Sequence, residues 1–347
     1  MIILCFGTRP EVIKLSPIIT ELKKRNQPFK TIFSGQHKQL YEDVKQLIPS
    51  PNYNLGIMKQ NQSINDVLFS ISKKLPPILK KENARLVIVQ GDTSTALSSA
   101  LVAFNEGIEV GHVEAGLRTY NLKNPFPEEG NRQLISRISK YNWAPTKQAK
   151  QNLEDENIKN VILTGNTIID VCQAFRFKRR YRNKVLVTLH RRENFGDTMK
   201  TLFDELETVS CQHPELEFIF PMHHNPNVQQ YKHRLTKVNV IAPLKYKEMI
   251  QLISEVKFVI SDSGGIQEEC AFFRKKILVC RKTTERPEGI SVGITKLVGK
   301  DILNHFDWAN DNPEVDCENP YGNGDASCII VDSIWMIINK SYHIAKI

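Results

Sequence analysis

The stretch Ser261-Asp262-Ser263-Gly264-Gly265-Ile266-Gln267-Glu268-Glu269 joins an apolar run at 256–260, typical of a strand, to a segment with helical periodicity. Two glycines at the turn let the backbone approach a ligand, and the helix that follows offers unpaired N–H groups and the positive end of its dipole. The stretch therefore predicts either a diphosphate site or a plain strand-to-helix turn with Ser263 as N-cap. The other segments of the sequence distinguish the diphosphate site from the plain turn.

Short apolar runs alternate with amphipathic segments along the chain, which predicts an α/β protein. In the first half we expect strands at 2–7, 29–34, 85–91, 108–114 and 160–164, and helices at 10–25, 37–48, 63–83, 94–106 and 129–141. In the second half we expect strands near 184–189, 217–221, 238–242, 256–261 and 276–280. This pattern is typical of mostly parallel sheets that are covered on both faces and bind ligands at the carboxyl ends of their strands.

A chain of 347 residues is too long for one ordinary core and is expected to form two domains. We place the first domain at 1–170 and the second at 183–325, with a helix at 326–347 that packs back on the first. Two doubly wound domains that face each other create a cleft, the usual place for a substrate.

Composition narrows the class of partner. The chain is 41% hydrophobic and 24% charged, as in soluble globular proteins, and contains no bilayer-spanning apolar run, and we expect no signal peptide. Seven cysteines without a Cys-x-x-Cys pair indicate reduced thiols in a cytoplasmic protein. A formal charge of +9 is compatible with nucleic acid, an acidic membrane or small anions. The densest basic run, 176–184, lacks a platform for stacking bases, so we interpret it as a solvated linker and expect neither nucleic acid nor membrane as a partner.

Polar residues follow the expected strands of the first half. Arg9 comes after the first strand, where it can bind phosphate or cap a sheet carboxylate, and Lys14 lies one turn further on. Asp92 and Glu114 end two later strands, and Glu128 stands where a proline-rich loop enters a helix. Each carboxylate alone could be an N-cap, an ion-pair partner or a helix-dipole contact. If the topology makes them converge, their repulsion raises the pKa of at least one carboxyl group, which suits acid–base catalysis.

In the second half, His190 ends a strand just before two arginines. A histidine there can protonate a departing phosphate oxygen, although a structural role is the alternative. His223 and His224 are adjacent in a loop, but no further ligand at suitable spacing accompanies them, so we expect no metal. Arg286 follows the strand near 276–280 and offers a second phosphate clamp.

Together these segments resemble the non-hydrolysing UDP-N-acetylglucosamine 2-epimerase family. Blocks that match the family in order extend from residue 6 to about 325 and lie at 6–14, 90–95, 111–119, 125–132, 165–170, 189–196, 223–228, 262–269, 283–289 and 319–324. No single block is decisive, whereas the whole series in the family's order is highly specific.

The resemblance implies two Rossmann-like domains in a GT-B type arrangement, with UDP held mostly by the second domain. It also implies a reversible conversion of UDP-GlcNAc to UDP-ManNAc without a cofactor. UDP is eliminated to give 2-acetamidoglucal and adds back after reprotonation from the other face. The product would feed surface polysaccharide synthesis, and family members are commonly homodimers.

Carried over by position, the resemblance makes Asp92, Glu114 and Glu128 the acid–base carboxylates, with His190 and Arg9 at the diphosphate. It gives the remaining UDP contacts to Ser263, Gly264, Gly265, Glu269, Lys14 and Arg286, with Glu269 on the ribose. Which carboxylate removes the proton stays open.

The resemblance also implies a second, allosteric UDP-GlcNAc site, which would include Gln36, His37, Arg191 and His223. Several positions depart from relatives. Asn61 stands where such members have an arginine, and Met249 stands where some relatives have an aromatic residue at the uracil pocket.

Other functions are compatible with parts of the sequence. They are the same chemistry on a related UDP-2-acetamido sugar, a hydrolysing 2-epimerase, a GT-B glycosyltransferase and a non-catalytic UDP-sugar-binding protein. Pro10-Glu11 and Glu114-Ala115-Gly116 disfavour the hydrolysing branch, in which Ala-Asp and a doubled glycine are usual. A glycosyltransferase would leave three carboxylates and His190 without a role. We therefore predict a UDP-GlcNAc 2-epimerase.

Overall fold

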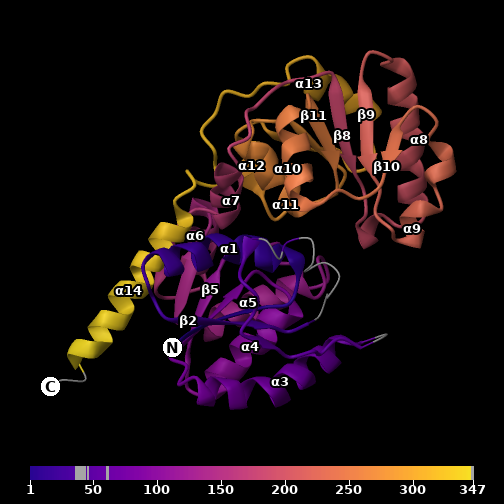
Figure 1. The fold of residues 1–347 in the computed structure, drawn as a ribbon. Helices are drawn as coiled ribbons and strands as arrows, with labels where there is room; N and C mark the ends of the chain where they lie inside the picture. The colour runs from indigo at the N-terminus through magenta and orange to yellow at the C-terminus, as the bar shows by residue number, and fades with distance from the viewer. Residues whose placement is uncertain (36–43, 45–46, 60–61, 345–347) are drawn as a thin grey trace. The chain divides into compact units, whose positions relative to one another are not determined.

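The computed structural model describes residues 1–35, 44, 47–59 and 62–344, with side chains described as far as Met336. The chain divides into two compact units (Figure 1). Unit 1 comprises Met1–Val171 and Gly322–Ile347, and unit 2 comprises Cys172–Tyr321. Unit 2 is therefore an insertion within the sequence of unit 1.

Within the described residues, unit 1 contains a seven-stranded parallel sheet in the order β3-β2-β1-β4-β5-β6-β7. Its strands are β1 (Ile2–Phe6), β2 (Phe29–Phe33), β3 (Tyr53–Asn54), β4 (Leu86–Gln90), β5 (Glu109–Val113), β6 (Tyr141–Ala144) and β7 (Val161–Leu163). Its helices are α1 (Arg9–Lys24), α3 (Ile64–Lys81), α4 (Ser94–Asn105), α5 (Glu128–Ile138), α6 (Lys147–Asp155), α7 (Thr167–Phe175), which runs on into unit 2, and α14 (Ala326–Ile344).

Unit 2 contains a six-stranded parallel sheet in the order β10-β9-β8-β11-β12-β13. Its strands are β8 (Lys184–Thr188), β9 (Glu217–Pro221), β10 (Asn239–Ile241), β11 (Phe258–Ser261), β12 (Ile277–Val279) and β13 (Thr295–Leu297). Its helices are α8 (Asp197–Gln212), α9 (Pro226–Gln229), α10 (Tyr246–Glu255), α11 (Gly264–Phe272), α12 (Pro287–Ser291) and α13 (Phe306–Asn310), with 3-10 turns at Arg192–Asn194, Lys232–Arg234 and Leu303–His305.

The predicted fold class, α/β with two doubly wound Rossmann-like domains, is confirmed by these two parallel sheets. The helix expected at 129–141 is wrong at its C-terminal end, because α5 stops at Ile138 and Tyr141–Ala144 form β6. All four β6 residues are buried, so no alternation of polar and apolar positions marks this strand in the sequence. Strands β3 and β13 were not expected, because two or three residues are too few to show a period. Most of the helix expected at 37–48 lies outside the described residues.

The central strands bring the candidate residues to the edges of the two sheets. In unit 1, β1, β4 and β5 are consecutive parallel neighbours, so the residues that follow them, including Arg9, Asp92 and Glu114, lie at one edge. In unit 2, β8 and β11 are parallel neighbours and lead to His190 and Ser263. The strand order thus groups the candidates within each unit.

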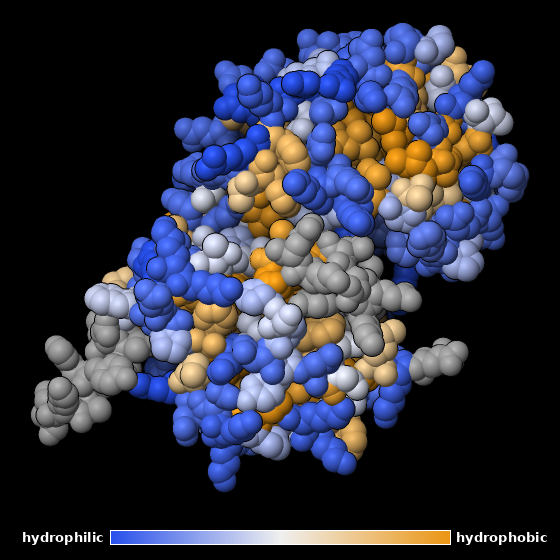
Figure 2. Space-filling model, in the orientation of Figure 1, coloured by the Kyte–Doolittle hydropathy of each residue, from blue (hydrophilic) through white to orange (hydrophobic). Residues whose placement is uncertain are grey.

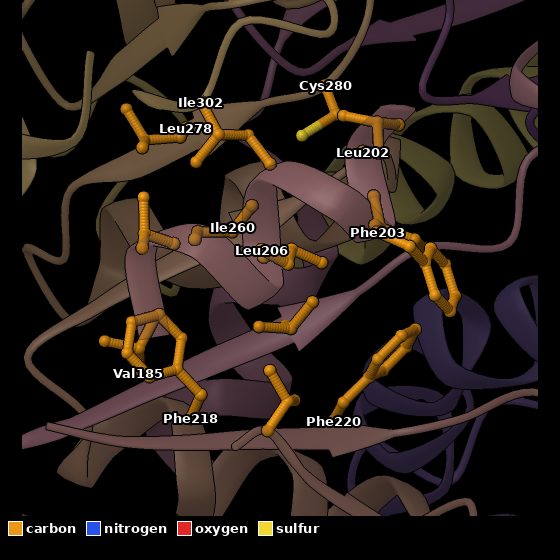
Figure 3. Close-up of a cluster of buried hydrophobic side chains, with 14 of the residues drawn as sticks. Val185, Leu202, Phe203, Leu206, Phe218, Phe220, Ile260, Leu278, Cys280 and Ile302 are labelled. Carbon is orange, nitrogen blue, oxygen red and sulfur yellow. The ribbon is translucent and has the colours of Figure 1, made fainter. Parts of the chain in front are cut away.

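The apolar core of unit 2 supports the loops at its sheet edge. Side chains of α8 and the sheet strands gather in one cluster (Figure 3), in which the Phe203 and Phe220 rings meet edge to face with centroids 5.7 Å apart. The cluster extends to Cys280, directly after β12. The carbonyl of Cys280 accepts a hydrogen bond from Nδ2 of Asn194 at 3.0 Å. The core is therefore joined directly to the loop that follows β8.

The basic segment after α7 was expected to be a solvated linker. It exposes most of its charged side chains, but its backbone forms hydrogen bonds with the rest of unit 2. The N–H of Arg180 donates to the carbonyl of Ser254 at 2.8 Å. Lys275 is buried, and its Nζ donates to the carbonyls of Arg180 and Val256. The same Nζ lies 3.5 Å from the centre of the Tyr181 ring. The segment is thus attached to unit 2 at its backbone and solvated at its side chains.

Helix α14 completes the core of unit 1. It packs against α1, and the carboxylate of Asp170 accepts hydrogen bonds from the N–H and hydroxyl of Ser327 at 2.8 and 2.6 Å. Nε1 of the fully buried Trp143 donates to Oγ of Ser333 at 2.8 Å. The indole N–H therefore depends on a residue far away in the sequence.

Figure 2 shows hydrophilic residues over most of the visible surface of each unit, with smaller apolar areas among these residues. In the described part of the chain, no helix combines the length and the hydropathy needed to cross a membrane. Each of the cysteines is a free thiol, and Cys5, Cys172, Cys270 and Cys280 are buried. Burial raises the pKa of the Cys5 thiol to about 12, so this group is a packing residue.

Replacing Ser333 by alanine removes the acceptor of the buried Trp143 indole. A buried donor without a partner costs about 1–3 kcal/mol, so we expect Ser333→Ala to lower the free energy of unfolding by that amount in urea titrations followed by fluorescence. Ser291→Ala is the matched control, because Ser291 is exposed and the change there should stay within about 0.5 kcal/mol. Equal midpoints for the two variants would contradict this role of α14.

Candidate functional site

A buried carboxylate, Glu11, holds the loop after β1. Its Oε2 accepts the N–H groups of Gly7 and Thr8 at 3.0 and 2.7 Å, and its Oε1 accepts the hydroxyl of Thr93 at 2.7 Å. Burial raises the pKa of Glu11, although these hydrogen bonds oppose the rise. Because Thr93 stands at the start of α4, one carboxylate joins the ends of β1 and β4. Arg9 is the first residue of α1 and directly follows the loop that Glu11 holds.

Glu114 follows β5 and forms an ion pair with Lys14 of α1. Its φ of +65° lies in the left-handed region, which non-glycine residues seldom adopt, and turns the chain sharply after the strand. Oε2 of Glu114 also accepts a hydrogen bond from Nδ2 of Asn166 at 3.3 Å. The side chains of Lys14 and Glu114 are both largely buried. Lys14, expected to support an anion, therefore lies against a carboxylate of its own unit.

Asp92 follows β4 and contacts the first turns of α5. Nε of Arg132 donates to Oδ2 of Asp92 at 2.9 Å, and Nδ2 of Asn131 donates to the Asp92 carbonyl at 2.7 Å. Arg132 is fixed in turn by Glu129, whose Oε2 accepts Nη1 at 2.8 Å. Burial pushes the pKa of Glu129 up, but hydrogen bonds, including one from Gln133, and the charge of Arg132 hold it below the usual value. A buried ion pair thus orients Asp92.

Glu128 is the first residue of α5 and is half-buried. Two of the three carboxylates expected to converge, Asp92 and Glu114, end the adjacent strands β4 and β5, and Glu128 begins the helix that holds Asp92. The topology therefore places all three at one edge of the unit 1 sheet.

His112 on β5 is a residue that the strand-end pattern missed. It is fully buried, and its Nε2 lies 2.7 Å from the carbonyl oxygen of Gly91. Because a carbonyl oxygen only accepts, Nε2 carries the proton. Burial lowers the pKa of His112 to about 4, so the ring is neutral at pH 7. His112 supports the residue before Asp92, and its position inside an apolar strand gave no signal of that role.

In unit 2, buried Asp262 organises the loop after β8. It accepts the N–H groups of His190 and Arg191 at 3.0 and 2.9 Å, and Nδ2 of Asn194 at 3.1 Å. Nδ1 of His190 lies 3.4 Å from Oδ1 of Asp262. The His190 ring stacks on the ring of His223 with centroids 5.9 Å apart. Burial and the neighbouring histidines His190 and His224 lower the pKa of His223.

Ser263, Gly264 and Gly265 form the start of α11. Ser263 holds the N-cap position, but its hydroxyl makes no capping hydrogen bond, so an ordinary serine-capped turn does not describe this helix start. A Cβ on Gly264 would lie 2.7 Å from Nη1 of Arg286 and 3.1 Å from Oε1 of Glu285. Apart from its chain neighbours and the backbone of α11, a Cβ on Gly265 would meet no described atom within 4 Å. The two glycines therefore differ: a Cβ at 264 would collide with neighbouring side chains, whereas a Cβ at 265 would collide with none of those described.

Arg286 is held beside the start of α11 by two carboxylates. Its Nε donates to Oε1 of Glu268 and its Nη1 donates to Oε1 of Glu285, both at 2.6 Å. Glu269, which the resemblance assigns to a ribose, is buried and accepts the hydroxyl of Tyr246 at 2.9 Å. Both residues thus have defined partners within unit 2.

Of the expected allosteric residues, Gln36 and His37 lie outside the described part of the chain, as does Asn61. Arg191 lies next to the start of α11, since its Nη2 is 3.3 Å from the Cβ position of Gly264. Among the described residues, no group of histidine, cysteine and carboxylate side chains is arranged to hold a metal ion.

Comparison with known proteins places this geometry in context. A family model described as UDP-N-acetylglucosamine 2-epimerase matches residues 20–335. The UDP-N-acetylglucosamine 2-epimerase of Neisseria meningitidis serogroup A is 40% identical, over 95% of this chain and 97% of its own length.

Solved structures agree with the sequence matches. The crystal structure of UDP-GlcNAc 2-epimerase from Neisseria meningitidis bound to UDP-GlcNAc aligns with a TM-score of 0.89 and 37% identity, covering 96% of this chain and 99% of that chain. The Methanocaldococcus jannaschii UDP-GlcNAc 2-epimerase in complex with UDP-GlcNAc and UDP aligns with a TM-score of 0.82 and 32% identity, over 96% of this chain and 99% of that chain.

The two glycines of α11 allow a matched test. Gly264→Ala should displace Arg286 from its carboxylates and lower the free energy of unfolding by about 1–3 kcal/mol, as overpacking usually does. Gly265→Ala should keep or raise stability, because alanine favours a helix by about 0.5–1 kcal/mol relative to glycine. Thermal melts of the two variants measure the difference. A Gly264→Ala protein as stable as the Gly265→Ala protein would contradict the packing described for Arg286.

Proposed function

This chain belongs to the UDP-N-acetylglucosamine 2-epimerase family, and from that premise we propose that it interconverts UDP-GlcNAc and UDP-ManNAc. The observation that carries the proposal is the likeness, over 96% of the chain, to a Neisseria meningitidis enzyme whose structure holds UDP-GlcNAc. The reaction is an isomerisation that needs no cofactor, and its product would enter surface polysaccharide synthesis. Buried free thiols support a cytoplasmic location.

The proposed chemistry avoids direct inversion of a weakly acidic C2–H bond. A base removes the C2 proton, the electron pair forms the C1–C2 double bond, and the C1–O bond breaks to release UDP. The intermediate is 2-acetamidoglucal. An acid then returns a proton to the opposite face of C2 while a phosphate oxygen of UDP adds back to C1. Both steps need groups that accept and donate protons and an anchor that retains UDP.

Unit 1 supplies the proposed acid–base groups, which are Asp92, Glu114 and Glu128. Lys14 forms an ion pair with Glu114. Arg132 gives Asp92 a fixed orientation.

The proposed UDP anchor is the start of α11 in unit 2, and the family resemblance proposes Arg9 as a further diphosphate ligand. Ser263, Gly264 and Gly265 would bind the diphosphate at the positive end of α11, as helix N-termini commonly do. His190, held by Asp262, is suited to protonate the phosphate oxygen that leaves C1. Arg286 adds positive charge at the same helix start. Glu269, oriented by Tyr246, would accept ribose hydroxyls.

An NMR experiment in heavy water tests the reaction. We expect UDP-GlcNAc incubated with the protein to give UDP-ManNAc that carries deuterium at C2, because the proton that returns comes from a group in exchange with solvent. Asp92→Asn, Glu114→Gln and Glu128→Gln should each lower kcat by about 10²-fold or more, as loss of an acid–base group does. UDP binding by calorimetry is the control that each variant retains its nucleotide site.

Other outcomes would identify other functions. Release of free ManNAc would identify a hydrolysing enzyme. UDP binding without any exchange at C2 would indicate a binding protein or an enzyme for a related UDP-2-acetamido sugar, which a panel of such sugars distinguishes. Full activity in all three carboxylate variants would refute the assignment to unit 1. Activation by UDP-GlcNAc through Gln36, His37, Arg191 and His223 stays a proposal that sigmoidal kinetics would support.

We also propose that the protein is a homodimer joined through unit 1. Helices α3, α4 and α5 pack side by side and expose Phe69, Phe104 and Leu134, which are 70%, 53% and 57% accessible. Large apolar side chains on adjoining helices are typical of a contact with another protein surface. Light scattering should give twice the mass of one chain, and Phe69→Ser should shift the mass toward one chain. A monomeric wild-type protein at micromolar concentration would contradict the proposal.

A further inference from the structure

A carboxylate lies at the helix start where the proposed function requires an anion to bind. Oε1 of Glu285 is 3.1 Å from the position that a Cβ on Gly264 would take, and the Glu285 side chain is buried. The N-terminus of a helix favours negative charge, so Glu285 and the diphosphate of a UDP-sugar would experience the same positive field. The cations that bind Glu285 therefore decide how far it opposes a second anion.

Each oxygen of the Glu285 carboxylate accepts a hydrogen bond from a different arginine. Nη1 of Arg286 donates to Oε1 at 2.6 Å, and Nη1 of Arg281 donates to Oε2 at 3.0 Å. Each arginine has a second carboxylate, because Nε of Arg286 binds Glu268 at 2.6 Å and Nε of Arg281 binds Glu193 at 2.7 Å. The result is a row of alternating charges with three carboxylates, two guanidinium groups and one net negative charge.

Arg281 is the more deeply buried of the two arginines in this row. Only 1% of its side chain is exposed, and its Nη2 is buried without a hydrogen-bond partner in the described structure. Leaving a buried donor unpaired is costly, so the two ion pairs that the geometry secures have to compensate. Glu193 lies three residues after His190, in the loop held by Asp262. Arg281 thus connects the His190 loop to the carboxylate that orients Arg286.

We propose that Arg281 is a positioning residue of the UDP anchor, which holds Glu285 so that Glu285 orients Arg286 without cancelling its charge. The inference rests on the proposed function, because it concerns the same diphosphate site. Arg281 touches neither substrate nor reacting atoms in this role. It acts through Glu285 on one side and through Glu193 on the other.

Removal of Arg281 changes the field at the helix start in a definite direction. The row then carries two net negative charges, and Glu285 loses one of the two arginines that bind it. Arg286 stays paired with Glu268 and Glu285 and would attract a diphosphate less. Removing the Glu285 charge as well returns the row to one net negative charge. A glutamine at 285 can still accept Nη1 of Arg286, so the orientation of Arg286 is kept.

Calorimetric titration with UDP tests the inference. We expect Arg281→Met to raise the Kd for UDP by about tenfold or more, since truncating one member of a buried charged pair has large effects. Glu285→Gln alone should lower the Kd, because it removes a negative charge from the helix start, and Arg281→Met combined with Glu285→Gln should bring the Kd back to within about threefold of wild type. Arg281→Lys should give an intermediate value, because an ammonium group cannot reproduce the fork. Arg182→Met, which breaks an exposed pair with Glu255, is the control.

The outcomes separate this inference from the proposed function and from simple loss of stability. If Arg281→Met binds UDP with an unchanged Kd and the wild-type protein epimerises UDP-GlcNAc, the inference is overturned and the proposed function is retained. A wild-type protein that binds UDP but does not epimerise would overturn the proposed function alone. If Arg281 only maintained the fold, Glu285→Gln would also weaken UDP binding and the double variant would be the weakest. If Arg281→Met does not fold, Arg281→Lys decides, because an unchanged Kd for UDP in Arg281→Lys would overturn the inference.

Discussion

In each unit, a buried carboxylate that accepts backbone N–H groups holds the loop at the edge of the sheet. In unit 1, Glu11 receives the N–H groups of the two residues after β1. In unit 2, Asp262 receives those of His190 and Arg191 after β8. A buried carboxylate without donors is very unfavourable, so neither loop can move without losing this compensation. The groups proposed to bind and convert a sugar nucleotide are therefore placed by charge pairing as much as by apolar packing.

The two units use charge in opposite ways. At the edge of the unit 1 sheet, a cation orients each candidate carboxylate: Lys14 pairs with Glu114, and Arg132 pairs with Asp92. At the edge of the unit 2 sheet the relation is reversed, because the carboxylates of Glu268 and Glu285 orient the guanidinium group of Arg286. Such fixed partners reduce the reorganisation that charge development in a reaction would otherwise require. Proton transfer and anion binding can then depend on residues that are held in place by partners of their own unit.

The sequence allowed prediction of the α/β class and of the residues that follow strands, because a polar residue after an apolar run is a local signal. Thus Asp92, Glu114 and His190 were found at the expected sheet edges. Partners distant in the chain were not predictable. Arg281 binds Glu193 across 88 positions, and no period or spacing connects them. Similarly, His112 supports Gly91 from within an apolar strand, and the fully buried strand β6 shows no alternation to separate it from a helix end.

The insertion of unit 2 into unit 1 has a consequence for how the protein is made. The residues of unit 2 are contiguous, so this unit can complete its sheet as soon as it leaves the ribosome. Unit 1 cannot, because Asp170 and the buried indole of Trp143 find their partners on α14, which is translated after the whole of unit 2. The unit whose synthesis begins first therefore cannot complete these contacts until the last helix has been made.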